Sequence, residues 1–369
     1  MSRPTRAIIN LDALRHNCLL ARELAPGSQL VAVVKANAYG HGLLPVARAL
    51  EPLVQVLAVA CSEEALKLRR EGVQLPILVL EGPFAESELA VAAQENFWLM
   101  LHEPRQVQWI LDTDLPHKLK VWLKADTGMH RLGMSERVLL DNLVRLQASR
   151  RVQAPVVVAT HFAAADQPDS DATLQQWQRF RALTHGLSQP TSVANSATIM
   201  AWPQLHGDLV RPGIMLYGSS PFPAGHAQAP QPVINRLRPV MSLKSEVIAV
   251  RSVAAGESVG YGRRWTAQRE SRIATIAVGY GDGYPRHAPS GTPLLINRQR
   301  APLVGTVSMD MITADVTDLA GVVPGSEVEL WGENLSVDEI ADHANTIGYE
   351  LLTRMPARPP RIYLGDSTG

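Results

Sequence analysis

The sequence predicts an α/β protein in which an N-terminal (β/α)8 barrel of the TIM type is followed by a mainly antiparallel β domain. Short apolar runs alternate with amphipathic segments up to about residue 235, and β-rich segments follow them. The chain has 369 residues, and at about 150 residues per domain this length favours two domains. We expect the barrel at residues 1–235 and the β domain at residues 236–369.

Apolar runs of strand length define the first domain. Strands that alternate with helices pair in parallel and are covered on both faces, so about eight such units predict a barrel. The expected strands are 30–34, 56–60, 76–80, 97–101, 119–123, 156–160, 192–194 and 213–217, of which 192–194 has the weakest signal. Amphipathic segments lie between them at 62–71, 86–94, 135–147 and 173–186.

The pattern changes after Asn235. The segments "SLKSEVIAVRSV", "IATIAVGY", "APLVGTVSMDMITADV" and "GSEVELWG" are β-rich and are separated by Gly and Pro. No long helical pattern follows until residues 337–347. This arrangement predicts a separate antiparallel domain, and the Pro- and Gly-containing segment 219–232 is the expected linker.

Composition narrows the class of protein. Lys plus Arg number 35 and Asp plus Glu number 35, so the net charge is zero, which argues against a nucleic-acid partner. Cys18 and Cys61 match no metal-ligand spacing, and we expect neither a metal site nor a disulfide. The first residues contain no apolar signal segment, and no run is long enough to span a bilayer, so we expect a cytoplasmic protein without a membrane partner.

Polar side chains follow several of the expected barrel strands. Each one alone has an ordinary explanation, such as a solvated lysine, a structural histidine or a turn. A barrel would bring them together, because its functional residues collect at the C-terminal ends of the strands. The side chains concerned are Lys35, Lys124 with Asp126, His161, Asn195 with Ser196, and Arg211.

Eight motifs occur in a fixed order along the chain. They are "VVKANAYGHG", "WLKADTGMHRLG", "THFAAAD", "NSATIM", "VRPGIMLYG", "VGYGRRW", "VGYGDGYPR" and "GTVSMDM". Together they resemble the alanine racemase family of pyridoxal 5'-phosphate enzymes, and the resemblance covers nearly the whole chain. The stretch "TRMPARPPRIY", residues 353–363, is the part that it places least well.

The resemblance implies a cofactor site in the barrel. Lys35 matches the lysine that binds the aldehyde of pyridoxal phosphate, for which an amine at a strand end is suited. Tyr39 matches a phosphate ligand. The rest of the implied phosphate site is Ser196, the backbone amides of Gly213 and Ile214, and Tyr349.

The resemblance also implies a two-base interconversion of L-alanine and D-alanine. Racemisation needs one proton-transfer group on each face of the cofactor. Lys35 would act on the α-proton of D-alanine, and Tyr261 of the partner subunit on that of L-alanine. Arg211 matches the residue that faces the pyridine nitrogen, which it leaves unprotonated because arginine keeps its own proton. His161 would link Arg211 to the second base.

The remaining implied residues concern the substrate. Arg131 matches a group that holds the cofactor's phenolic oxygen and the substrate carboxylate, and Met309 matches a substrate contact. Lys124 is a possible carbamylated lysine that would orient Arg131, although it could equally be an ordinary lysine that pairs with Asp126. The expected substrate entrance consists of Asp166, Tyr280 and Arg286.

The family's assembly is a head-to-tail homodimer in which the β domain of one chain covers the barrel of the other. A decarboxylase of the same architecture would place an acid and a β-domain cysteine where this chain has Arg211 and Ser308. A non-catalytic pyridoxal-phosphate carrier would lack the second domain. A racemase of broad specificity remains an alternative, and the sequence leaves open a biosynthetic or a catabolic role.

Overall fold

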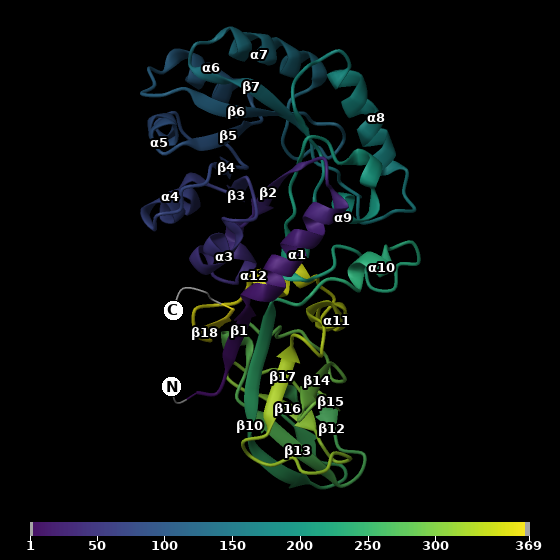
Figure 1. The fold of residues 1–369 in the computed structure, drawn as a ribbon. Helices are drawn as coiled ribbons and strands as arrows, with labels where there is room; N and C mark the ends of the chain where they lie inside the picture. The colour runs from purple at the N-terminus through teal and green to yellow at the C-terminus, as the bar shows by residue number, and fades with distance from the viewer. Residues whose placement is uncertain (1–2, 366–369) are drawn as a thin grey trace.

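The computed structural model describes residues 3–365 as a barrel that is joined to a second, β-rich domain (Figure 1). Within these residues the barrel sheet has eight strands in the order β8-β7-β6-β5-β4-β3-β2-β9, and every neighbouring pair along this order is parallel. Their bounds are β2 (Gln29–Val33), β3 (Val56–Val59), β4 (Ile77–Val79), β5 (Phe97–Leu101), β6 (Leu119–Lys124), β7 (Val152–Ala159), β8 (Thr191–Ser192) and β9 (Leu209–Val210).

The barrel is nearly closed between β8 and β9, the two edge strands of this order. β8 and β9 form no ladder within residues 3–365, but Ser192 makes an isolated bridge with Gly207, and the Ser192 hydroxyl donates to the Leu209 carbonyl at 2.8 Å. The predicted fold class is therefore confirmed, with a short junction at the run that had the weakest strand signal.

Helices cover the outside of the barrel. The Asn10 side chain caps the first one by accepting from the amides of Asp12 and Ala13, and Leu14, Cys18 and Ala21 are buried at helical spacing. The larger helices are α1 (Leu11–Leu24), α3 (Leu43–Leu50), α4 (Ser62–Arg70), α5 (Glu88–Gln94), α6 (Pro104–Asp112), α7 (Glu136–Ala148) and α8 (Ala172–Thr184). The short α9 (Ser196–Ala201) and α10 (Gln231–Ile234) follow.

The prediction of a strand at 213–217 is wrong. The last barrel strand is β9, and residues Ile214–Tyr217 form a 3-10 helix, η2. The run is entirely buried, and periodicity alone cannot distinguish a short buried strand from a buried turn of helix. The chain bends here because the amides of Gly213 and Met215 both donate to the Ser196 hydroxyl.

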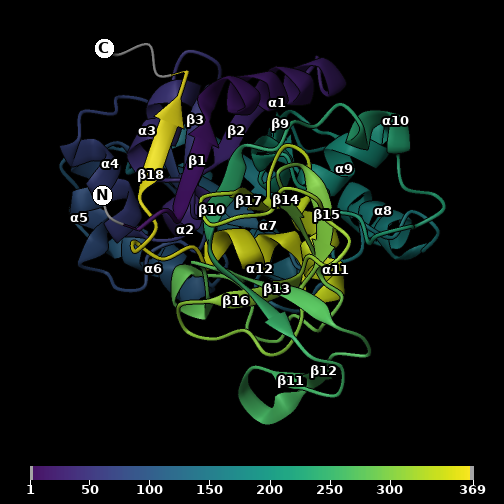
Figure 2. The ribbon, with the colours of Figure 1, turned by 90° about the horizontal axis from the view of Figure 1, so that it is seen from below.

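The second domain is built on a mainly antiparallel sheet. Its order is β15-β14-β17-β10-β1-β18, and β13 pairs with β10 and β16. The strands are β1 (Arg6–Asn10), β10 (Met241–Val253), β13 (Ser271–Ile276), β14 (Pro293–Ile296), β15 (Gln299–Pro302), β16 (Ile312–Asp315), β17 (Glu327–Trp331) and β18 (Arg361–Leu364). A separate ribbon, β11 (Ser258–Val259) and β12 (Trp265–Thr266), projects from this domain (Figure 2). The helices α11 (Val337–His343) and α12 (Gly348–Thr353) lie near the end of the chain.

Both ends of the described chain belong to the sheet of the second domain. β1 pairs antiparallel with β10 and parallel with β18. The expected range 1–235 groups β1 with the barrel, whereas its hydrogen bonds join it to the other domain. α1 follows β1 directly, so the chain crosses from the second domain to the barrel near Asn10 and returns after η2.

Two further features bear on the class of protein. Cys18 and Cys61 are both free thiols. Among residues 3–365, no helix has the length and apolar character needed to cross a membrane.

Candidate active site

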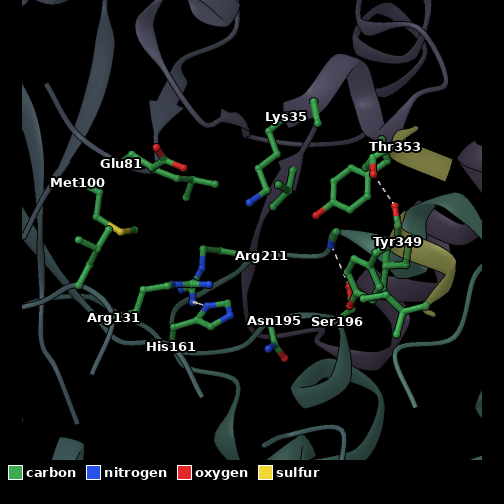
Figure 3. Close-up of a pocket in the computed structure, with 18 of the residues that line it drawn as sticks. Lys35, Glu81, Met100, Arg131, His161, Asn195, Ser196, Arg211, Tyr349 and Thr353 are labelled. Atoms are coloured by element: carbon green, nitrogen blue, oxygen red, sulfur yellow. Dashed lines mark hydrogen bonds between the residues drawn. The ribbon is translucent and has the colours of Figure 1, made fainter. Parts of the chain in front are cut away.

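A cavity of about 790 Å³ opens at the C-terminal ends of the barrel strands (Figure 3). Residues that follow β2, β6, β7, β8 and β9 meet there with residues from α12. It is lined by eleven residues expected from the sequence: Lys35, Tyr39, Lys124, Arg131, His161, Asn195, Ser196, Arg211, Gly213, Ile214 and Tyr349. The structure therefore brings the implied cofactor residues together at one site.

Lys35 opens a left-handed turn, labelled α2 (Lys35–Tyr39). Ala36, Asn37, Ala38 and Tyr39 have φ between 50° and 54°. For L-residues this conformation costs about 1–2 kcal/mol each, and such strain persists only where the surroundings enforce it. The turn places the Tyr39 ring in the same cavity as the Lys35 side chain, which Figure 3 shows pointing into it.

The barrel holds the start of this turn through side-chain acceptors. The Glu64 carboxylate on α4 accepts from the Ala36 amide at 2.7 Å and from the Ala60 amide at 3.0 Å, which ties the ends of β2 and β3 together. The Asn37 side chain accepts from the Leu43 amide at 2.9 Å. The left-handed backbone is thus fixed by hydrogen bonds from outside the turn.

One end of the cavity is rich in hydroxyl groups. The Tyr39 ring stacks on Tyr217 at 4.6 Å between centroids and lies 6.2 Å from the Tyr349 ring. Burial raises the pKa of Tyr39 and of Tyr349 well above the usual value, so both hydroxyls are protonated donors. A side chain at Gly213 would lie 2.7 Å from the Tyr39 hydroxyl, and glycine therefore keeps this end open for a ligand.

Arg211 directly follows β9 and lines the cavity. Its guanidinium donates to the Ser192 hydroxyl at 2.5 Å and to the Thr160 carbonyl at 2.8 Å. Burial lowers the pKa of Arg211 to about 10, so it remains charged at neutral pH. Since its partners here are neutral acceptors, the positive charge is available to a ligand.

His161 lies beside Arg211. Its Nδ1 atom is 3.5 Å from an Arg211 nitrogen (Figure 3). Burial lowers the pKa of His161 well below its usual range, and the charges of Arg211 and Lys124 lower it further. His161 is therefore a neutral imidazole that can accept a hydrogen bond from Arg211.

Lys124, at the end of β6, also lines the cavity. Burial, followed by the charges of Arg211 and Arg131, lowers the pKa of Lys124 to about 8. Asp126 instead accepts from the His130 and Gly128 amides and from the His130 ring, and among residues 3–365 no ion pair joins it to Lys124. The low pKa makes a neutral amine accessible, as carbamylation would require, and the modification itself stays a prediction.

Other expected residues lie outside this cavity in their own chain. Tyr261 lies between β11 and β12 and is 73% exposed. Met309 is 53% exposed and Tyr280 is 39% exposed, both in the β domain, and Arg286 is exposed there as well. Asp166 is half-buried in the segment after β7. A single chain therefore does not bring the expected second base to Lys35.

Comparisons with known proteins give a consistent result over both domains. A family model described as alanine racemase, N-terminal domain, matches residues 9–221, and its C-terminal counterpart matches residues 240–363. The alanine racemase of Pseudomonas taetrolens is 48% identical over 99% of this chain and 100% of its own length. The chain belongs to the alanine racemase family. It is therefore an amino-acid racemase, an isomerase.

Solved structures agree with this family assignment. The biosynthetic alanine racemase from Pseudomonas aeruginosa has a TM-score of 0.93 at 46% identity and covers 98% of this chain and 99% of its own. An alanine racemase from Pseudomonas putida that is named catabolic is 48% identical over 99% of this chain and 100% of its own length. A relative named biosynthetic and a relative named catabolic are thus nearly equally similar to this chain in sequence.

Several residues in and around the cavity were not predicted from the sequence. Glu81 follows β4, Met100 lies within β5, and both line the cavity. Ile347, which is 60% exposed, lines it as well. Ser192 and Thr160 hold the guanidinium of Arg211. Glu81 directly follows an apolar run, and the strand-end rule applied to all eight strands would have found it.

We predict that His161 makes the racemase less stable as the pH falls below about 6.5, the usual pKa of histidine. The unfolded chain takes up a proton there, whereas the folded chain, with its lowered His161 pKa, does not. This part of the stability is present above that pH and is lost below it. Replacing His161 by Gln should reduce the pH slope of unfolding free energy by about 1.4 kcal/mol per pH unit.

The measurement is urea unfolding of both proteins between pH 7 and pH 5. The control is His117→Gln, which changes an exposed histidine outside the cavity. Equal slopes for the wild type and for His161→Gln would show that His161 is protonated in the folded protein.

Proposed function

We propose that this chain interconverts L-alanine and D-alanine with pyridoxal phosphate bound in the barrel cavity. The observation that carries the proposal is the convergence of Lys35, Arg211 and the Tyr39 hydroxyl on one cavity in a member of the alanine racemase family. The bound cofactor supplies an aldehyde for amines and an electron-withdrawing ring that acidifies the α-hydrogen of the amino acid.

The donors in the cavity fit this cofactor. Phosphate requires several N–H and O–H donors, and the hydroxyls of Tyr39, Ser196 and Tyr349 with the amides of Gly213 and Ile214 would hold it at one end. Lys35 would bind the aldehyde. The resting protein would thus be joined to its cofactor at both the lysine and the phosphate end.

Arg211 would face the pyridine nitrogen. Its guanidinium stays charged with a pKa of about 10, so it would donate a hydrogen bond to the ring nitrogen and leave that nitrogen unprotonated. Arg211 would thereby limit side reactions that depend on strong electron withdrawal by the ring. The neutral His161 beside it would extend the hydrogen-bond chain toward the second base.

Two groups would move the α-proton. Lys35 would take it from D-alanine, and Tyr261 of the partner subunit would take it from L-alanine. The 73% exposure of Tyr261, outside its own chain's cavity, supports a base that serves another chain. A head-to-tail homodimer would cover this side chain and complete both sites.

The substrate would be held by its carboxylate. Arg131 would bind that group and the cofactor's phenolic oxygen, and Met309 would contact the substrate from the partner subunit. Lys124, once carbamylated, would become an anion that orients Arg131. Asp166 of the barrel with Tyr280 and Arg286 of the partner's β domain would form a polar entrance that favours a small amino acid.

We predict that Lys35→Ala abolishes both racemisation and the covalent bond to the cofactor. Lys124 is the matched control, because it also lines the cavity, and Lys124→Ala should retain that bond. Borohydride reduction followed by peptide mass spectrometry identifies the modified lysine. A reduced adduct of normal occupancy in Lys35→Ala would contradict the assignment.

We predict that Tyr261→Phe slows proton removal from L-alanine much more than from D-alanine. The phenol is the proton carrier on one face only, so Lys35 continues to serve the other face. Exchange of the α-proton with deuterated solvent, followed separately from each isomer, measures the two steps. Equal losses from both isomers would contradict the division between the two bases.

We predict that inactive Lys35→Ala and inactive Tyr261→Ala recover activity when they are unfolded together and refolded. In a mixed dimer one site receives both defects and the other receives neither. Random pairing makes about half of the dimers mixed, so about a quarter of wild-type activity should return. If one chain supplied both residues of a site, mixing would restore nothing.

A further inference from the structure

The stretch that the family resemblance places least well, residues 353–363, lies against the Lys35 turn. We name residues 355–364 the C-terminal strap. It follows α12, which carries Tyr349, and ends in β18 beside β1. The strap is therefore held at both ends by regular structure, and the Lys35 turn packs against it.

Two strap side chains donate to carbonyls at the end of the turn. The Arg361 Nε atom donates to the Gly40 carbonyl at 2.7 Å, and the Tyr363 hydroxyl donates to the His41 carbonyl at 3.1 Å. Other nitrogens of Arg361 donate to the carbonyls of Met355 at 3.0 Å and Pro356 at 3.3 Å. The Arg361 guanidinium thus links the strap to the end of the turn and also links the two ends of the strap to each other.

Glycines at the end of the turn are required by this contact. A Cβ atom at Gly40 would lie 2.0 Å from the Leu352 carbonyl oxygen, and one at Gly42 would lie 2.0 Å from the Tyr363 hydroxyl. Both glycines also have positive φ, 82° and 104°. The backbone here lies too close to α12 and to the Tyr363 hydroxyl for a Cβ atom to fit unless a neighbour moves.

The hydrogen bonds that hold the Lys35 turn come from two parts of the chain, the barrel and the strap. Glu64 of the barrel accepts from an amide at the start of the left-handed turn, whereas Arg361 and Tyr363 donate to carbonyls at its end. A backbone in a sparsely populated conformation remains there only when its surroundings over-determine it. Lys35 and Tyr39 lie at the two ends of this turn, so its shape sets the separation of their side chains.

We propose that Arg361 and Tyr363 are positioning residues that hold the Lys35 turn in the conformation in which Lys35 and Tyr39 engage one cofactor together. Neither residue lines the cavity within the described chain, so each acts through the backbone of the turn. This inference rests on the proposed pyridoxal-phosphate function, because it concerns how tightly that cofactor is held.

The test compares cofactor binding in holoenzymes of the wild type, Arg361→Met, Arg361→Lys and Tyr363→Phe. Loss of a charge-assisted hydrogen bond should raise the cofactor dissociation constant about 10- to 100-fold in Arg361→Met, and loss of a neutral one about 3- to 10-fold in Tyr363→Phe. Arg361→Lys keeps the charge but cannot serve all three carbonyls at once, and it should fall between the wild type and Arg361→Met.

The readouts are cofactor release after dilution, followed by the visible band of the bound cofactor, and the kinetic constants for alanine. We expect kcat to fall with KM nearly unchanged, because the base is displaced while the carboxylate site is intact. Arg300→Met is the matched control, since Arg300 is 59% exposed and pairs with Glu339 in the β domain. It should retain wild-type cofactor affinity.

Urea unfolding of each variant shows whether a loss of cofactor affinity comes from the local position of the turn or from a loss of global stability. Wild-type cofactor affinity in both Arg361→Met and Tyr363→Phe would overturn the proposal. A loss of affinity in these variants that Arg300→Met shares would also overturn it. If the wild-type protein itself binds no pyridoxal phosphate, the proposed function fails first, and the strap inference fails with it.

Discussion

The left-handed turn after β2 is the constraint on which the rest of the site depends. Four non-glycine residues with φ near 50° follow Lys35, and this conformation is costly for each of them. It survives because α4, α12 and β18 all contact it. A regular right-handed helix beginning at Lys35 would point Tyr39 in another direction. The strained turn is therefore what brings the side chains of Lys35 and Tyr39 into one cavity.

Electrostatics explain what kind of ligand the cavity favours. Lys35, Lys124, Arg131 and Arg211 line the same space, and their mutual repulsion contributes to the lowered pKa of Lys124. Gathering positive charge in a partly buried cavity is unfavourable unless an anion binds there. A phosphate and a carboxylate would relieve the repulsion, which agrees with a phosphorylated cofactor and an amino-acid substrate.

The two domains are joined by more contacts than the linker alone provides. β1 lies in the sheet of the second domain beside β18, and Arg358 in the same strap reaches Asp310, next to Met309, at 2.6 Å. The strap therefore contacts the cofactor turn of the barrel and a loop of the β domain in one chain. In the proposed dimer these two parts serve different active sites, so a single segment would touch the machinery of both.

Sequence alone determined the barrel, the β domain and most cavity residues. Apolar periodicity identifies strands such as 97–101, and the ends of parallel strands must meet at one rim, so Lys35, His161 and Arg211 could be grouped in advance. The resemblance supplied the implied roles of side chains such as Tyr261, which has no local signal. The run 213–217 was misread because its burial on all sides hides its period.

Tertiary structure decided how the turn after Lys35 is held. Little in "KANAYGHG" signals four left-handed residues, because Ala and Tyr by themselves prefer other conformations and Asn enters this one only as a single residue. The acceptors and donors that stabilise the turn come from Glu64, Arg361 and Tyr363, two of them more than 300 residues away in the chain. Contacts of such separation exist only after β1 and β18 have paired, and the sequence therefore specifies them only through the completed fold.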